Sequence, residues 1–180
     1  MASATPNAGA CDQAIRLDIE AEIATINYGM QIYTSVPEAE RTDEQRRLLA
    51  SVMTLLDSRD RPVSQADVDI LDAALGYLSS EAVWDRADDR RCGQQDTRWS
   101  IFCALQRASV DVTGTYEHRR TALQEVRFII EVRSEGRDYA HRMMDYNNDP
   151  ETSFDEARAV VSEARAVVAD RLSRQCPAKD

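Results

Sequence analysis

The sequence predicts an all-α protein, an antiparallel bundle of about five helices with one very long or kinked helix at about residues 96–148. Three observations support this class. Apolar residues recur every three or four positions along most of the chain, which is the period of an amphipathic helix. Prolines fall between these periodic segments, where they do not interrupt a helix. No segment shows the alternating pattern of a convincing strand.

The first three helices are expected before residue 92. The first covers about residues 12–36, and the second begins at Thr42, where a glutamine three residues later completes a capping-box pattern. The third begins at the capping residue Ser64 and ends near Arg91. We expect its Asp- and Arg-rich end, residues 85–91, to be a solvated face. The buried stripe of the first helix is expected to consist of Ile15, Ile19, Ile23, Ile26, Met30 and Tyr33.

The segment 96–148 contains no proline and keeps near-heptad apolar spacing. It predicts either one helix of unusual length or a kink near Gly114, because residues 110–115 are β-branched and glycine-bearing, which is poor helix sequence. Residues 122–132 are apolar on most faces, so we expect them to form the most enclosed helix. The last helix begins at Ser153, again with a capping box.

No break in composition divides the chain, so a single domain is expected over residues 11–176, between a disordered tail at 1–10 and a short tail at 177–180. The net charge of −10 is spread along the chain without a cationic cluster, so nucleic acid and anionic membranes are poor partners. No apolar run reaches the about 18 residues of a membrane span. No signal peptide is recognisable, and we hypothesise that one has been removed.

Four cysteines lie at the ends of predicted helices, and three pairings are open to them. Cys11 begins the first helix and Cys176 ends the last, while Cys92 and Cys103 flank the connection before the long segment. We therefore expect the disulfides Cys11–Cys176 and Cys92–Cys103. They predict a periplasmic or secreted protein, whereas four free thiols would indicate a cytoplasmic one. No Cys-x-x-Cys pair occurs, so no metal site is expected.

Sequence motifs for catalysis are missing. There is no glycine loop for phosphate and no nucleophile elbow, so no cofactor and no catalytic residue is assigned. The two histidines, His118 and His141, would lie more than about 30 Å apart in a continuous helix, because a helix rises about 1.5 Å per residue. They share no metal ion unless the segment folds back.

Polar side chains of the long segment are the candidate binding residues. Arginines on an apolar stripe are expected to pair with carboxylates of neighbouring helices, for instance Glu20 or Glu22, or to cover apolar surface with their aliphatic stems. The alternative is that they line a pocket for an anionic ligand. Asparagines before Pro150 form a turn that a partner could contact. The candidates are Tyr116, His118, Arg119, Arg120, Arg133, Arg137, His141, Asn147 and Asn148.

Two classes of function fit this outline. The first is a non-enzymatic, extracytoplasmic module that binds another protein, of the inhibitor or immunity kind, because such proteins are small, acidic, helical and disulfide-bonded. The second is a small helical-bundle enzyme or binder whose arginines, Arg119, Arg133 and Arg137, hold an anionic small molecule, as in secreted chorismate-mutase-like bundles. Such a site typically includes a lysine, and Lys179 is the only one in the chain. The sequence is also compatible with a homodimer that buries one helix face.

Overall fold

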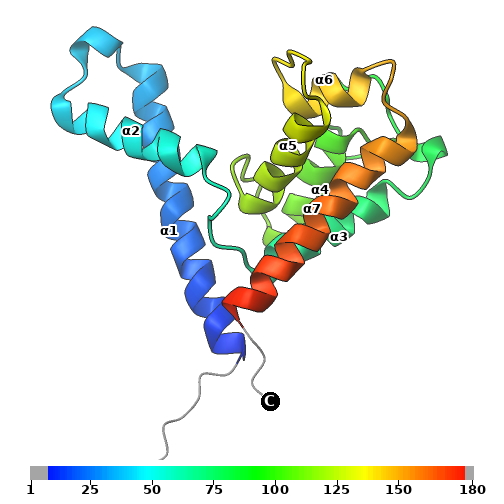
Figure 1. Ribbon diagram of the computed structural model, residues 1–180, viewed down its shortest axis with the longest axis horizontal. Coiled ribbons are helices and arrows are strands. Elements are labelled where there is room, and N and C mark those ends of the chain that lie inside the picture. Colours follow the sequence, from blue (N-terminus) through cyan, green and yellow to red (C-terminus); the bar gives the residue numbers. More distant parts are fainter. Residues whose placement is uncertain (1–7, 177–180) are drawn as a thin grey trace, which may run out of the picture. The chain divides into compact units, whose positions relative to one another are not determined.

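The computed structural model describes residues 8–176, which form seven α-helices and no strand beyond an isolated bridge between Trp84 and Trp99 (Figure 1). The all-α class is confirmed. The expected count of about five helices is too low, because the segment 96–148 breaks twice. The segments 1–7 and 177–180 of the expected tails lie outside the described residues.

The chain divides into two compact units, residues 1–63 and 64–180. The first contains α1 (Ala8–Ser35) and α2 (Asp43–Asp57), joined by a short 3-10 turn at Glu38–Glu40. The second contains the other five helices. The single domain expected over residues 11–176 spans both units and stays a prediction.

In the first unit, α1 begins at Ala8 rather than at about Asp12. The tail expected at residues 1–10 is therefore too long by three residues. Alanine, the residue with the highest helix propensity, occupies the first position of the helix. α1 and α2 pack closely, since a Cβ added at Gly29 would lie 2.7 Å from a methyl of Val52. Of the stripe expected to be buried, Tyr33 is exposed.

The predicted start of α2 is confirmed. The Thr42 amide donates to the side chain of Gln45 over 2.9 Å, and the Gln45 amide donates to the Thr42 hydroxyl over 3.2 Å. These two bonds satisfy amides that have no partner inside the helix.

The second unit is built from α3 (Gln65–Tyr77), α4 (Ile101–Thr113), α5 (Thr121–Arg133), α6 (Arg142–Asn148) and α7 (Phe154–Gln175). α3 packs against α4 and α7, and α5 packs against α7 and α6 (Figure 1). The core includes the fully buried side chains Ile70, Leu71, Leu78, Ile101, Leu105, Leu123 and Ile130. The expected enclosure of residues 122–132 applies to most of α5, although Val132 at its end is exposed.

The end of α3 differs from the prediction: the helix stops at Tyr77, well before Arg91. The Asp-rich stretch that follows is a loop, because its carboxylates bond to backbone amides two residues ahead. Asp85 accepts from the amide of residue 87, Asp88 from that of residue 90, and Asp89 from that of residue 91, over 2.7–3.0 Å. Such Asx turns compete with the helical hydrogen bonds.

The segment 96–148 is three helices rather than one. The expected break near Gly114 is confirmed: this residue ends α4 in the left-handed conformation, with φ of 77°. A second break was not expected. After α5 the hydroxyl of Ser134 bonds back to the carbonyl of Ile130 over 2.6 Å, and Gly136 adopts φ of 84°. Glycine populates this region without the clash of a Cβ.

Two further sequence predictions are confirmed in the second unit. Ser153 begins α7 with a capping box, accepting from the amide of Glu156 and donating its own amide to that side chain. Cys92 and Cys103 form a disulfide, with their Cα atoms 5.3 Å apart. No cysteine of the described chain is a free thiol, while the pairing of Cys11 with Cys176 stays a prediction.

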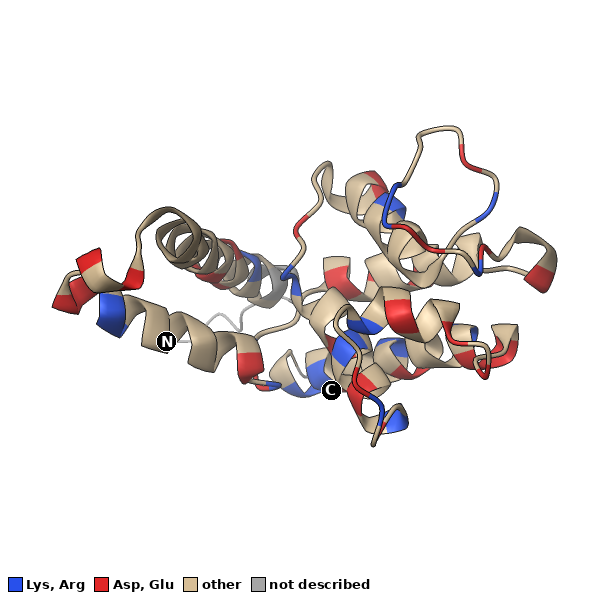
Figure 2. Cartoon of the chain, turned by 90° about the horizontal axis from the view of Figure 1, so that it is seen from above, with Lys and Arg blue, Asp and Glu red and all other residues tan. Residues whose placement is uncertain are grey.

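Acidic and basic residues are interspersed over the helices, without a block of one sign (Figure 2). Across residues 8–176, no helix combines the length and the apolar character needed to cross a bilayer.

Candidate functional site

A pocket of about 230 Å³ opens in the second unit. It lies between the loop before α4, the connection from α4 to α5, and the start of α6. Part of its wall is basic and the rest is apolar, and none of its lining residues is acidic. The lining residues are Arg90, Phe102, His118, Arg127, Ala140, His141, Arg142, Met143 and Met144.

Both histidines reach this pocket because the chain between them folds back. It turns first at Gly114, which places His118 in the connection before α5, and turns again around Gly136. His141 then occupies the N-cap position of α6. The separation expected for a continuous helix therefore does not apply, and the structure brings two of the predicted candidates together.

His118 is held by two neighbours. The Tyr116 hydroxyl lies 2.8 Å from its Nδ1 atom. Arg127 donates through Nη1 to the His118 carbonyl over 2.9 Å, and its Nη2 lies 3.2 and 3.3 Å from the two ring nitrogens. The phenol of Tyr116 in turn packs edge-on against Phe102, with ring centroids 6.0 Å apart. These contacts fix the orientation of the imidazole.

Burial, together with the positive charges in and near the pocket, lowers the pKa values of two of its residues, His118 and Arg127. Burial lowers the pKa of His118 to about 4, and the charges of Arg127 and Arg119 act in the same direction. The side chain of His118 is nevertheless exposed at the surface, so water screens part of this effect. Burial also lowers the pKa of Arg127 to about 10, helped by Arg119 and Arg142. At neutral pH the ring of His118 is neutral and the guanidinium group of Arg127 stays charged.

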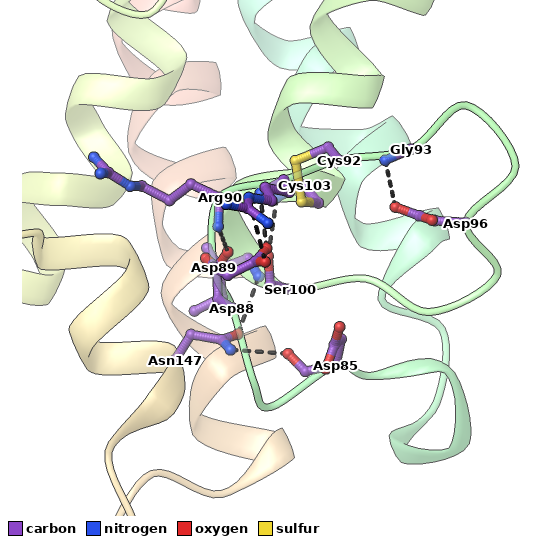
Figure 3. Close-up of a disulfide and its surroundings, with 12 residues drawn as sticks. Asp85, Asp88, Asp89, Arg90, Cys92, Gly93, Asp96, Ser100, Cys103 and Asn147 are labelled. Carbon is purple, nitrogen blue, oxygen red and sulfur yellow. Dashed lines mark hydrogen bonds and ion pairs between the residues drawn. A yellow bond between two sulfur atoms is a disulfide. The ribbon is translucent and has the colours of Figure 1, made fainter.

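Arg90 enters the pocket from a constrained loop. It adopts φ of 61°, a conformation that costs a non-glycine residue about 1 kcal/mol or more. Asp88 stabilises this turn by accepting from the Arg90 amide over 2.7 Å. Asn148 holds Asp88, accepting from its amide and donating to its carbonyl, each over 2.8 Å. The Arg90 side chain extends away from the nearby Cys92–Cys103 disulfide (Figure 3).

The three pocket arginines differ in their partners. Arg142 forms a two-bond ion pair with Glu131, over 2.9 and 3.1 Å, so its charge is already matched. Within residues 8–176, no carboxylate forms an ion pair with Arg90 or Arg127. The pocket therefore contains two guanidinium charges that no neighbouring side chain neutralises.

The arginines predicted from sequence lie elsewhere. Arg120 is buried and pairs with Asp67 over 3.0 Å, which joins the start of α5 to the start of α3. Arg133 pairs with Glu163 of α7 over 2.8 Å. Arg137 pairs with two carboxylates of the connection between α6 and α7, each over 2.9 Å. Arg133 and Arg137 thus form ion pairs as expected, but with carboxylates of the second unit and not with Glu20 or Glu22. Those two glutamates pair with Arg16 and Arg61. None of Arg120, Arg133 and Arg137 lines the pocket.

Arg119 is also outside the lining and acts on the pocket through its charge. Asn147 is fully buried and joins three segments of the second unit. Its side chain accepts from the indole of Trp84 and from the amide of Ile101. It donates to the carbonyl of Asp85 (Figure 3). Asn148 acts on the pocket indirectly, through the loop of Arg90.

Three lining arginines were not predicted. Arg90 belongs to the run interpreted as a solvated helix face, Arg127 lies in the apolar stretch of α5, and Arg142 adjoins His141. A signal was present for Arg127, because a guanidinium inside an apolar helix needs a counter-charge or a ligand. Arg90 had no such signal, since its position depends on Asx turns and on Asn148. Within the described chain, no group of three or more His, Cys, Asp or Glu residues is arranged to hold a metal ion.

The fold and the pocket define a helical protein with a small basic cavity. The chain belongs to a family described as "Family of unknown function (DUF6197)", which matches residues 62–167. This range contains every residue that lines the pocket. No curated protein and no solved structure matches the chain.

Proposed function

We propose that this protein binds a small anionic molecule in the basic pocket of its second unit. One observation carries the proposal: Arg90, Arg127, Arg142, His118 and His141 line one cavity whose lining contains no carboxylate. Glu131 offsets the charge of Arg142, but the charges of Arg90 and Arg127 have no carboxylate partner in the described chain, and placing them together is unfavourable unless an anion offsets them. Residues whose pKa is perturbed inside a cleft are typical of functional sites.

We further propose that the protein acts in a periplasmic or secreted setting. The Cys92–Cys103 disulfide supports this, because such bonds persist in oxidising compartments. Mass analysis of protein alkylated directly in the producing cells tests it. Protection of the cysteines is expected, and full alkylation contradicts the proposal.

A screen of small anions by thermal denaturation, followed by titration calorimetry of the hits, tests the binding proposal. A ligand present at 100 times its dissociation constant stabilises the folded state by about 2.7 kcal/mol. Neutral analogues of the hits are expected to give no shift. Failure of every anion at low ionic strength contradicts the proposal.

Arg127→Gln is the variant that links binding to the pocket. A hydrogen bond to a charged group contributes about 1.5–3 kcal/mol, so affinity should fall at least about tenfold. Arg174→Gln is the matched control, because this arginine is exposed and pairs with Asp170 on α7, outside the pocket lining. Equal loss of affinity in both variants would show that binding is non-specific.

The protein-binding role of the inhibitor or immunity kind, and the enzymatic alternative, stay predictions. Arg119, Arg133 and Arg137, on which the enzymatic alternative was based, do not line the pocket. Affinity capture from the native cell envelope remains the test of the protein-binding role.

A further inference from the structure

We propose that the ligand of this pocket is a phosphate monoester whose organic part is one small apolar group. This inference rests on the proposed function and specifies the substrate class. Three features of the pocket support it: its uncompensated charge, the directions from which its donors come, and its apolar wall.

The charge of the pocket matches a dianion. Arg90 and Arg127 form no ion pair with a carboxylate of the described chain, whereas Arg142 is matched by Glu131. Two uncompensated guanidinium groups balance the two negative charges that a phosphate monoester carries above its second pKa of about 6. A monocarboxylate or a sulfate monoester carries one negative charge and leaves a guanidinium unmatched.

The donors come from separate stretches of the chain. Arg90 enters from the loop before α4, Arg127 from the middle of α5, and His141 from the start of α6. A planar carboxylate is satisfied by one guanidinium fork, which donates two parallel bonds in one plane. A tetrahedral phosphate presents three oxygens in different directions, and donors on several sides fit it better.

The remainder of the wall is apolar and the cavity is small. Phe102, Met143 and Met144 contribute rings and thioethers rather than hydrogen-bond partners. The volume of about 230 Å³ is below the roughly 300–1,000 Å³ of sites for drug-sized ligands. The group esterified to the phosphate is therefore a single ring or a short aliphatic chain, without a large polar moiety.

The backbone of Arg90 is held in one conformation before any ligand binds. Its left-handed backbone is maintained by the carboxylate of Asp88, which is itself held by Asn148. A loop that is ordered in advance loses less conformational entropy on binding. Arg90 is thus one of the two guanidinium groups on which we expect discrimination of the dianion to depend.

Calorimetric titration of the full chain at pH 8 and low salt, with four probes, separates charge from geometry. Phenyl phosphate is a tetrahedral dianion, phenyl sulfate a tetrahedral monoanion, phenylmalonate a dicarboxylate and benzoate a planar monoanion. Phenyl phosphate is expected to bind at least about tenfold more tightly than each of the others. Inorganic phosphate is expected to bind more weakly than phenyl phosphate, because it leaves the apolar wall unoccupied.

Arg90→Gln is expected to reduce the affinity for phenyl phosphate to that for phenyl sulfate. Arg91→Gln is the matched control: Arg91 is the next residue, is 90% exposed and is not part of the pocket lining. Arg90→Lys should recover part of the affinity, since it restores the charge without the fork. Near-ultraviolet circular dichroism verifies that each variant is folded.

The outcomes distinguish this inference from the proposed function. If benzoate, phenylmalonate or phenyl sulfate binds as tightly as phenyl phosphate, the phosphate assignment is wrong while anion binding stands. If inorganic phosphate binds equally well, the ester assignment is wrong. If none of the anions binds, both the inference and the proposed function fail.

Discussion

Replacing Asn147 by alanine is expected to destabilise the second unit by about 3 kcal/mol. The side chain of Asn147 is fully buried. It accepts hydrogen bonds from the Trp84 indole over 2.9 Å and from the Ile101 amide over 3.1 Å, and it donates to the Asp85 carbonyl over 2.9 Å. Ile101 is the first residue of α4, so its amide has no partner within the helix.

The magnitude follows from the groups that alanine leaves behind. Each buried donor without an acceptor costs about 1–3 kcal/mol. Two such donors, the indole of Trp84 and the amide of Ile101, give roughly 2–6 kcal/mol. A water molecule that enters the space vacated by the amide recovers part of this loss, which places the expected value in the lower half of the range.

Urea unfolding followed by tryptophan fluorescence measures this change. Trp84 and Trp99 are the two tryptophans of the chain, and both lie in the second unit, so fluorescence reports on that unit. Asn148→Ala is the control; it removes bonds of an exposed residue and should cost about 1 kcal/mol. If Asn147→Ala changes the unfolding free energy by less than about 1 kcal/mol, the conclusion that the hydrogen bonds of Asn147 stabilise the second unit is wrong.

Three further predictions concern stability. Arg120→Met leaves the buried carboxylate of Asp67 without its cation and should destabilise the protein by about 3–5 kcal/mol in urea unfolding; an unchanged midpoint contradicts this. Because the pKa of His118 is lowered to about 4 from 6.5, the unfolded chain binds a proton that the folded one does not. The contribution of His118 to folding stability is therefore complete above about pH 6.5 and is lost as the pH falls towards 4. Nuclear magnetic resonance titration of the imidazole measures this pKa, and a bound anion should raise it. A pKa near 6.5 without ligand refutes the reasoning. Replacing Cys92 and Cys103 by serine should cost roughly 3 kcal/mol in thermal unfolding, from the entropy of the opened loop; an equally stable double variant would argue against it.

Helix starts could be predicted from the sequence because their signals are local. The capping boxes at Thr42 and Ser153 each depend on a bond between residues three apart, and both form as expected. Gly114 likewise terminates α4 through its own backbone conformation. A pattern contained within four residues does not require knowledge of the tertiary structure.

Helix ends that depend on tertiary contacts could not be predicted. The stretch after α3 forms local Asx turns, but its path is also held by the bond from Trp84 to Asn147, more than sixty residues later in the chain. The same dependence applies to the pocket. His118 and His141 were recognised as candidates, but their convergence depends on the second break at Gly136. Arg90 was overlooked because its partner in shaping the loop, Asn148, is equally distant.

The position of the Cys92–Cys103 disulfide affects how this protein should be produced for experiments. Cys92 follows Arg90 by two residues, in the loop that delivers the arginine to the pocket, and Cys103 anchors that loop to α4 (Figure 3). In protein produced in a reducing cytoplasm we expect this disulfide to be absent and the loop that carries Arg90 to be less well ordered. If the pocket binds an anion as proposed, we expect affinities measured on such protein to be too low, so the assay should use protein in which the Cys92–Cys103 disulfide is formed.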